Sequence, residues 1–270
     1  MSTTYHTPPL MALLVGEYKT GKTVSACTFP KPLLFLDWDG GFTSVEHTTL
    51  PNGKKVVEGI DQITHIEFIK EGYHNLDFKT SLQGSSAPEY TSSIPAMIQK
   101  FNTIMKSIAI DGCVEIDGVK KGPFQTLVID SLSAMFLIWK DMILNINKVP
   151  HLRVQDYDTL ESLLFRQLAP SLKAIGKKIP YILLINHTDM DKDEISGRVM
   201  EFPIGPSKAM GKKMGRLTDE IWIQKVEKDD RIWRTTKDGL LNAGSRLHLP
   251  SEIKPATFQT LESVLSKRKT

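Results

Sequence analysis

Residues 16–23 read Gly16-Glu17-Tyr18-Lys19-Thr20-Gly21-Lys22-Thr23 and match the pattern G-x-x-x-x-G-K-[ST] at every fixed position. Loops of this pattern surround phosphates with backbone N–H donors, and glycine permits the close turns that this requires. The helix that follows directs the positive end of its dipole at the phosphates. We therefore predict a phosphate-binding loop, in which Lys22 reaches the β- and γ-phosphates and Thr23 offers a hydroxyl ligand to Mg²⁺.

The segments on both sides of this loop have the character that the pattern requires. Residues 10–15, LMALLV, form a nearly continuous apolar run, which is typical of a buried strand in a parallel sheet. A short helix is expected to begin near Lys22 and to end before Pro30 and Pro32, because proline interrupts helical hydrogen bonding. The order strand, loop, helix makes a chance match of the pattern improbable.

Apolar runs at residues 33–37 (LLFLD), 126–130 (TLVID) and 181–186 (YILLIN) predict three more buried strands. The tail from Asp219 alternates apolar and polar residues, as antiparallel strands do. The other expected elements are helices at 94–110, 132–146 and 157–175, a strand at 65–70, a hairpin at 113–122, and loops at 72–93 and 187–213. The fold class is therefore α/β, with a mostly parallel sheet flanked by helices and a C-terminal antiparallel extension.

Acidic residues close two of the expected strands. Asp130 ends the strand at 126–130 and is predicted to help hold Mg²⁺, although capping of the next helix would also place an acid there. Asp37 and Asp39 lie at the end of the strand at 33–37, and because they are two residues apart both are expected to point the same way. Hydrolysis needs a carboxylate that polarises the attacking water, and we prefer Asp39 for this role over an ordinary solvated turn.

The strand at 181–186 ends in Asn186, and His187 follows it. A polar pair at this place can sense a γ-phosphate and pass its state to the next loop. Ordinary strand-end hydrogen bonding is the alternative interpretation.

The composition excludes only some classes of function. The 270 residues include 34 Lys+Arg and 31 Asp+Glu, a balance too even to imply a nucleic-acid partner by itself. Cys27 and Cys113 cannot form a disulfide framework, and the residues contain neither a signal peptide nor an apolar run long enough for a bilayer. We expect a cytoplasmic protein without membrane contact, with residues 1–270 forming a single domain.

The chain resembles the RecA-like ATPases, and more closely the short phage-encoded nucleotide-binding proteins of that group, which include RecA-like single-strand annealing proteins. The resemblance rests on GEYKTGKT, the proline-terminated FPKP, LLFLDWDGG, LVIDS and LLINH, in this order between residues 10 and 218. It implies a RecA-like core that binds ATP and Mg²⁺ and hydrolyses ATP. It also places the catalytic carboxylate, usually Glu, at Asp39, and the γ-phosphate sensor, usually Gln, at His187.

The resemblance further implies single-stranded DNA as a partner and a homo-oligomer, either ring or filament. The loops that touch DNA in the family correspond to residues 145–157 and 188–207. The basic candidates are Lys148 and Arg153 in the first loop, and Lys208, Lys212, Lys213 and Arg216 just beyond the second. The second group could bind DNA phosphates, form a solvated helical face, or reach ATP held by the next subunit.

Three functions remain distinct at this point. The first is an ATP-hydrolysing, DNA-binding protein of phage recombination, annealing or repair. The second is a small-molecule kinase that uses the same phosphate loop. The third is a replication or packaging accessory that ATP switches with little hydrolysis, with which the shorter acid at Asp39 is compatible.

Overall fold

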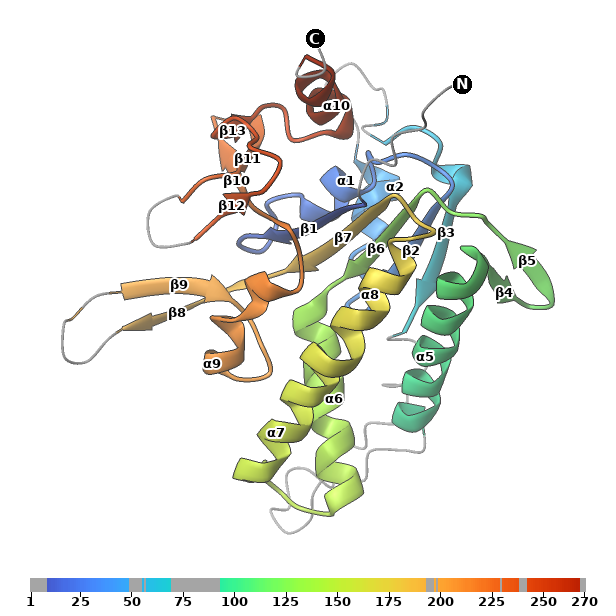
Figure 1. Ribbon diagram of the computed structural model, residues 1–270, viewed down its shortest axis with the longest axis vertical. Helices are drawn as coiled ribbons and strands as arrows, with labels where there is room; N and C mark the ends of the chain where they lie inside the picture. Colours follow the sequence, from blue (N-terminus) through green and yellow to red (C-terminus); the bar gives the residue numbers. More distant parts are fainter. Residues whose placement is uncertain are drawn as a thin grey trace.

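The computed structural model describes residues 9–48, 55, 57–68, 93–192, 197, 199–228, 230–237 and 242–267. Within these residues the centre of the molecule is a nine-stranded sheet (Figure 1). Its strands are β1 (Leu10–Val15), β2 (Leu33–Asp37), β3 (Ile63–Glu67), β6 (Thr126–Asp130), β7 (Tyr181–Asn186), β10 (Glu220–Glu227), β11 (Asp230–Arg234), β12 (Gly244–Ser245) and β13 (Glu252–Ile253).

The strand order is β13-β11-β10-β1-β7-β6-β2-β3, and β12 pairs with β10. The strands from β10 to β3 in this order run parallel, whereas β11, β12 and β13 pair antiparallel. The expected fold class is confirmed, including the C-terminal antiparallel extension. One detail differs, because β10 is itself a parallel neighbour of the phosphate-loop strand β1.

Helices cover both faces of the sheet (Figure 1). They are α1 (Lys22–Ala26), α2 (Thr43–His47), α5 (Ser93–Asp111), α6 (Leu132–Asn147), α7 (Val154–Ser162), α8 (Ala169–Ile175), α9 (Lys208–Gly211) and α10 (Phe258–Ser266). Core residues of α5, α6, α7 and α8 pack on one face, and those of α1, α2 and α10 pack on the other. None of the described helices is long and apolar enough to cross a membrane.

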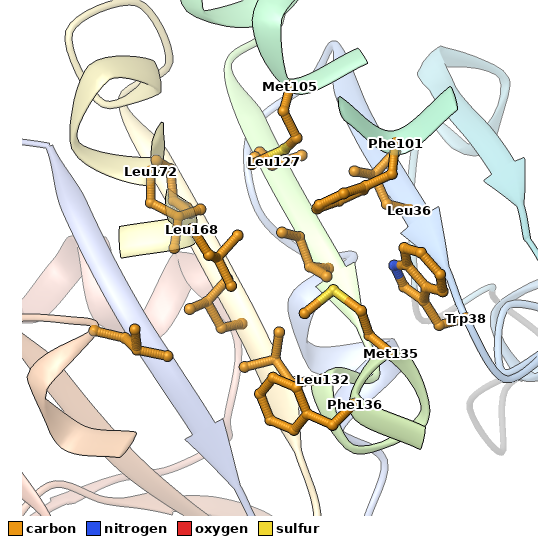
Figure 2. Close-up of a cluster of buried hydrophobic side chains, with 14 of the residues drawn as sticks. Leu36, Trp38, Phe101, Met105, Leu127, Leu132, Met135, Phe136, Leu168 and Leu172 are labelled. Atoms are coloured by element: carbon orange, nitrogen blue, oxygen red, sulfur yellow. The ribbon is translucent and has the colours of Figure 1, made fainter. Parts of the chain in front are cut away.

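The strands are apolar on both sides because both of their faces are buried. Alternate residues of β1 divide between the two faces: Leu13 contributes to the core under α5, α6 and α8, and Leu14 to the core under α1 and α10. Figure 2 shows the first of these cores, where Met105 of α5 lies beside Leu127 of β6 and Met135 of α6 lies further along the sheet. Burial of this apolar area is the main force that holds the sheet and its helices together.

Several expected elements are confirmed closely. Helix α5 spans Ser93–Asp111 and α6 spans Leu132–Asn147. The hairpin in residues 113–122 consists of β4 (Val114–Ile116) and β5 (Val119–Lys121), with φ of 50° at Asp117 and 75° at Gly118. These two positive φ values explain why an Asp-Gly pair occupies the turn.

Three expectations need correction. The helix expected at 157–175 begins at Val154 and contains a π-helical stretch, η2 (Leu163–Leu168), between α7 and α8. Residues 187–213 are not a loop, since β8 (Thr188–Lys192) pairs with β9 (Val199–Pro203) and α9 follows. Their polar, exposed residues concealed the strands. Strand β3 begins before residue 65, the expected start, and residues 69–92, which include nearly all of the loop expected at 72–93, lie outside the described part.

Candidate phosphate-binding site

The site lies at the carboxyl ends of β1, β2, β6 and β7. The segments that follow these four parallel strands leave the sheet there. Strand β7 lies between β1 and β6, and β2 lies on the far side of β6. Segments after neighbouring parallel strands leave the sheet at the same edge, and ligands bind in the crevice that they form. The sheet therefore brings together the phosphate loop, the turn after β2, Asp130 and His187.

The phosphate loop connects β1 to α1 and turns sharply at Lys19 and Gly21, whose φ values are 64° and 83°. The Thr20 hydroxyl donates to the Glu17 carbonyl at 3.0 Å, which closes the loop on itself. Helix α1 begins directly after the loop, as the sequence predicts. The expected strand, loop and helix are thus all present.

Lys22 is buried at the centre of the site. Its Nζ donates to the carbonyl oxygens of Gly16 at 2.9 Å and Glu17 at 2.6 Å, and it lies 3.2 Å from His187 Nδ1. Burial lowers the pKa of Lys22 from 10.5 to about 8, against the attraction of Asp130 and Asp39. A bound phosphate group would stabilise the charged form, because it supplies the anion that the buried ammonium lacks.

Thr23 and Asp130 meet across the loop. The Thr23 hydroxyl donates to Asp130 Oδ2 at 2.6 Å, and Asp130 is almost fully buried. Burial, reinforced by the neighbouring charge of Asp39, raises the pKa of Asp130 to about 7. Capping of α6 falls to Ser131, whose Oγ accepts from the N–H of Ala134, so capping does not account for Asp130.

The two acids at the carboxyl end of β2 have different partners. Asp37 is fully buried, and its carboxylate accepts four backbone N–H groups of the following turn. These donors are Asp39, Gly40, Gly41 and Phe42, at 3.2, 2.8, 3.2 and 3.1 Å. His65 Nε2 also lies 3.1 Å from Asp37 Oδ2. Asp37 therefore folds the turn, since its oxygens are already engaged by the backbone.

Asp39 projects from that turn toward the phosphate loop. A methyl group placed on Gly41 would lie 3.1 Å from Asp39 Oδ1, 3.5 Å from Thr23 Oγ1 and 3.6 Å from Asp130 Oδ2. Although burial opposes it, the polar groups of His187 and Ser131 and the Gly41 N–H hold the pKa of Asp39 below its usual value. Asp39 is thus an ionised carboxylate beside Thr23 and Asp130.

His187 links the two charged sides of the site. Its Nδ1 faces Lys22, its Nε2 lies 3.9 Å from Asp39 Oδ2, and its ring stacks on Tyr18 with 3.8 Å between centroids. Asn186 serves the backbone instead, since its Nδ2 donates to the Ile204 carbonyl at 2.7 Å and its Oδ1 accepts from the His187 N–H. Strand-end hydrogen bonding therefore describes Asn186, while His187 faces the site.

The donor set fits Mg²⁺, which prefers oxygen ligands and takes most of them from water and phosphate. Thr23 Oγ1 and Asp130 Oδ2 are hard oxygen donors that already lie side by side. Among the described residues no three His, Cys, Asp or Glu side chains gather around one point. With two protein oxygens, a Mg²⁺ ion here would take its remaining ligands from water and phosphate.

Sequence reasoning missed Gln224, which supports the loop from behind. This residue of β10 is buried, and its Nε2 donates to the Thr20 carbonyl and to Ser25 Oγ, both at 2.9 Å. Trp233 Nε1 donates in turn to Gln224 Oε1 at 2.9 Å. A glutamine on the same strand face as Trp222 was the available signal, because a buried amide needs partners.

The basic candidates include several that are paired with acids. Lys208 and Lys212 contact Asp191 of β8 at 3.0 and 3.3 Å. Lys213 contacts Glu161 of α7 at 3.0 Å. In the other group, Arg153 pairs with Asp156 at the start of α7.

Lys148 and Arg216 are exposed, and within the described part of the chain neither pairs with an acid. Lys148 ends α6 with a positive φ of 50°, and Arg216 closes the short helix η3 (Met214–Arg216). The structure therefore separates the six candidates into four paired and two solvent-facing cations.

Comparison with known proteins shows the family of the chain. The AAA domain family matches residues 8–247, which is most of the chain. The crystal structure of the RadB recombinase is similar with a TM-score of 0.43 and 15% identity, over 92% of this chain and 87% of that one. No curated protein sequence matches the chain. The family and the site together identify a nucleotide-binding phosphate-loop domain.

Proposed function

The chain belongs to the AAA domain family, and from this premise we propose that it binds ATP with Mg²⁺ and hydrolyses ATP. The observation that carries the proposal is the convergence of Lys22, Thr23, Asp130 and Asp39 from three strand ends on one loop. Each supplies what phosphoryl transfer to water requires: a cation for the phosphates, two oxygens for the metal, and a carboxylate for the water.

Four residues of the site have distinct roles in the proposed hydrolysis, and Asp37 supports one of them. Lys22 exchanges its contacts with the Gly16 and Glu17 carbonyls for phosphate oxygens. Thr23 and Asp130 hold Mg²⁺, which neutralises charge on the phosphates when bound. Asp39, ionised because its pKa is lowered, orients and polarises the attacking water. Asp37 keeps the turn rigid so that Asp39 stays in place.

We propose that His187 senses the γ-phosphate and reports it to the hairpin β8–β9. It lies between Lys22 and Asp39, the two residues whose contacts a γ-phosphate would change. Its backbone carbonyl accepts from the Ile204 N–H at 2.8 Å, just after β9. A shift of the ring can therefore move the base of the hairpin.

We also propose that single-stranded DNA is the partner, that the active form is a homo-oligomer, and that the work is phage recombination, annealing or repair by a single ATPase domain. The exposed cations Lys148 and Arg216 support phosphate contact, and Lys208 and Lys212 could exchange Asp191 for DNA phosphates. A contact of Lys212 or Lys213 with ATP on a neighbouring subunit is the other use of the same residues.

A second candidate function is an ATP-dependent switch with little hydrolysis. Asp39 favours it, because this short side chain is partly engaged by His187 and Ser131. Tight ATP binding with nucleotide-dependent oligomers and negligible phosphate release would identify the switch.

The deciding experiment measures phosphate release from Mg·ATP with and without single-stranded DNA, beside the oligomer size in each state. We expect turnover that DNA stimulates and that Lys22→Ala abolishes. A rate that stays constant across the DNA titration would contradict the DNA partner, and phosphate transfer to a nucleoside or sugar would point instead to a kinase.

A further inference from the structure

Arg231 of β11 lies against the phosphate loop, although nothing in the proposed reaction uses it. A Cβ atom placed on Gly21 would lie 2.3 Å from Arg231 Nε, 2.7 Å from its Cδ and 3.1 Å from its Cζ. The guanidinium therefore packs directly over the Gly21 backbone, one residue before Lys22. Only a glycine leaves room for this approach.

The face of β11 that carries Arg231 is the face that supports the loop. Arg231 and Trp233 are two residues apart on one strand, so their side chains share a side. Trp233 donates to Gln224, and Gln224 holds the Thr20 carbonyl. The position of Arg231 on the loop is thus fixed by the same pairing of β10 with β11, in which Val226 faces Arg231.

Two other cations near β11 have acidic partners. Arg234 contacts Glu227 and Glu252, and Lys254 contacts Asp230 at 2.8 Å. Within the described residues no acid lies in ion-pair distance of the Arg231 guanidinium. A half-buried guanidinium without a carboxylate is a ready partner for a ligand anion.

The sheet order tells which end of a nucleotide Arg231 would meet. Asp130 of β6 and Asp39 after β2 lie on one side of β1, and β10 and β11 lie on the other. The acids and the metal oxygens belong at the β- and γ-phosphates. The α-phosphate then lies toward β10 and β11, where Arg231 reaches over Gly21.

We propose that Arg231 binds the α-phosphate of a nucleoside di- or triphosphate, an inference that rests on the proposed nucleotide site. The guanidinium completes a cradle of two cations, with Lys22 at the γ end and Arg231 at the α end of the phosphate chain. Arg231 contributes to affinity for both ATP and ADP, whereas Asp39 contributes to turnover.

The test is equilibrium binding of ATP, ADP and inorganic tripolyphosphate to the full-length chain, its Arg231→Gln and Arg231→Lys variants, and Arg246→Gln as the control. Arg246 is an exposed arginine that pairs with Asp219. We expect Arg231→Gln to lower the affinity for all three ligands about tenfold. Arg231→Lys should lower these affinities less, and Arg246→Gln should leave them unchanged. The melting temperature without ligand should match the parent chain.

Unchanged affinities in Arg231→Gln would overturn the proposal. A lower affinity for ATP and ADP with an unchanged affinity for tripolyphosphate would also overturn it, because Arg231 would then contact the base or sugar. If both Arg231 variants lose affinity and their melting temperatures without ligand fall by the same amount, Arg231 stabilises the loop instead. If the parent chain binds neither ATP nor ADP, the proposed nucleotide site itself is refuted, a result distinct from an effect confined to Arg231.

Discussion

The phosphate loop and the lysines around α9 both concentrate charge, but they do so in opposite ways. Lys22 is buried, lies among carbonyl oxygens and a histidine, and has a pKa lowered to about 8. Lys208 and Lys212 are exposed and each contacts Asp191. Burial without a full counter-charge costs stability, so such groups persist where a ligand completes them. Exposed ion pairs contribute little either way.

The largest expected effect comes from a substitution in the phosphate loop. Lys22→Ala should lower ATP turnover by about a thousandfold, because a preorganised cation at the phosphates is lost. Lys208→Ala, the matched surface lysine, should leave the intrinsic turnover without DNA unchanged and alter the unfolding free energy by less than about 1 kcal/mol. Phosphate release and chemical denaturation measure the two quantities. Similar turnover in both variants would remove the distinction between the regions.

Asp39→Asn and Asp37→Asn sharpen the comparison within one turn. Asp39→Asn should lower turnover by about a hundredfold while ATP still binds, because the group that polarises water is lost. Asp37→Asn should lower the unfolding free energy by about 2 kcal/mol, because a buried carboxylate that accepts four N–H groups becomes a weaker acceptor. Phosphate release and chemical denaturation separate the two effects. A stable Asp37→Asn protein, or an unstable Asp39→Asn protein, would reverse the assignment.

Asp130→Asn should stabilise the nucleotide-free protein in a pH-dependent way while it abolishes turnover. The pKa of Asp130 is raised from 3.8 to about 7, so the folded state disfavours the charged form. The cost begins as pH rises above 3.8 and is complete above pH 7, at about 4 kcal/mol. The melting temperature should therefore rise more at pH 8 than at pH 5.

The same comparison at a half-buried acid that pairs with two lysines serves as the control. Asp191→Asn should produce no such rise at either pH, because Asp191 is not fully buried and its charge is paired. An Asp130→Asn protein that is less stable than its parent at pH 8 would show that the buried charge does not oppose folding.

The smallest expected effect concerns DNA. Asp191→Asn frees Lys208 and Lys212 from their acid, so single-stranded DNA should bind roughly fivefold more tightly and with a steeper salt dependence. Fluorescence anisotropy at two salt concentrations measures both. Weaker binding, or no change, would mean that these lysines do not face DNA.

The parallel sheet could be predicted because each central strand is buried on both faces and reads as an apolar run. The pattern GEYKTGKT placed the loop, and strand ends placed Asp130, Asp39 and His187 beside it. The hairpin β8–β9 could not be found this way, because β8 carries polar residues on both of its sides.

The remaining site residues depend on contacts between distant segments. Asp37 and Asp39 look alike in sequence, and only the fold of the turn shows that Asp37 binds the backbone. Gln224 lies 204 residues after Thr20, which it holds, and Arg231 lies still later in the chain. The strand pairing that brings both to the loop has no local signal. Residues of this kind become visible only when the sheet order is known.

The most direct test of the proposed catalytic site is phosphate release from ATP with Mg²⁺ by the parent chain and by Lys22→Ala and Asp39→Asn, with ATP binding measured on the same samples. We expect measurable turnover in the parent chain, loss of turnover and weakened binding in Lys22→Ala, and loss of turnover with retained binding in Asp39→Asn. Equal turnover in all three proteins would contradict the assignment of these residues to ATP hydrolysis.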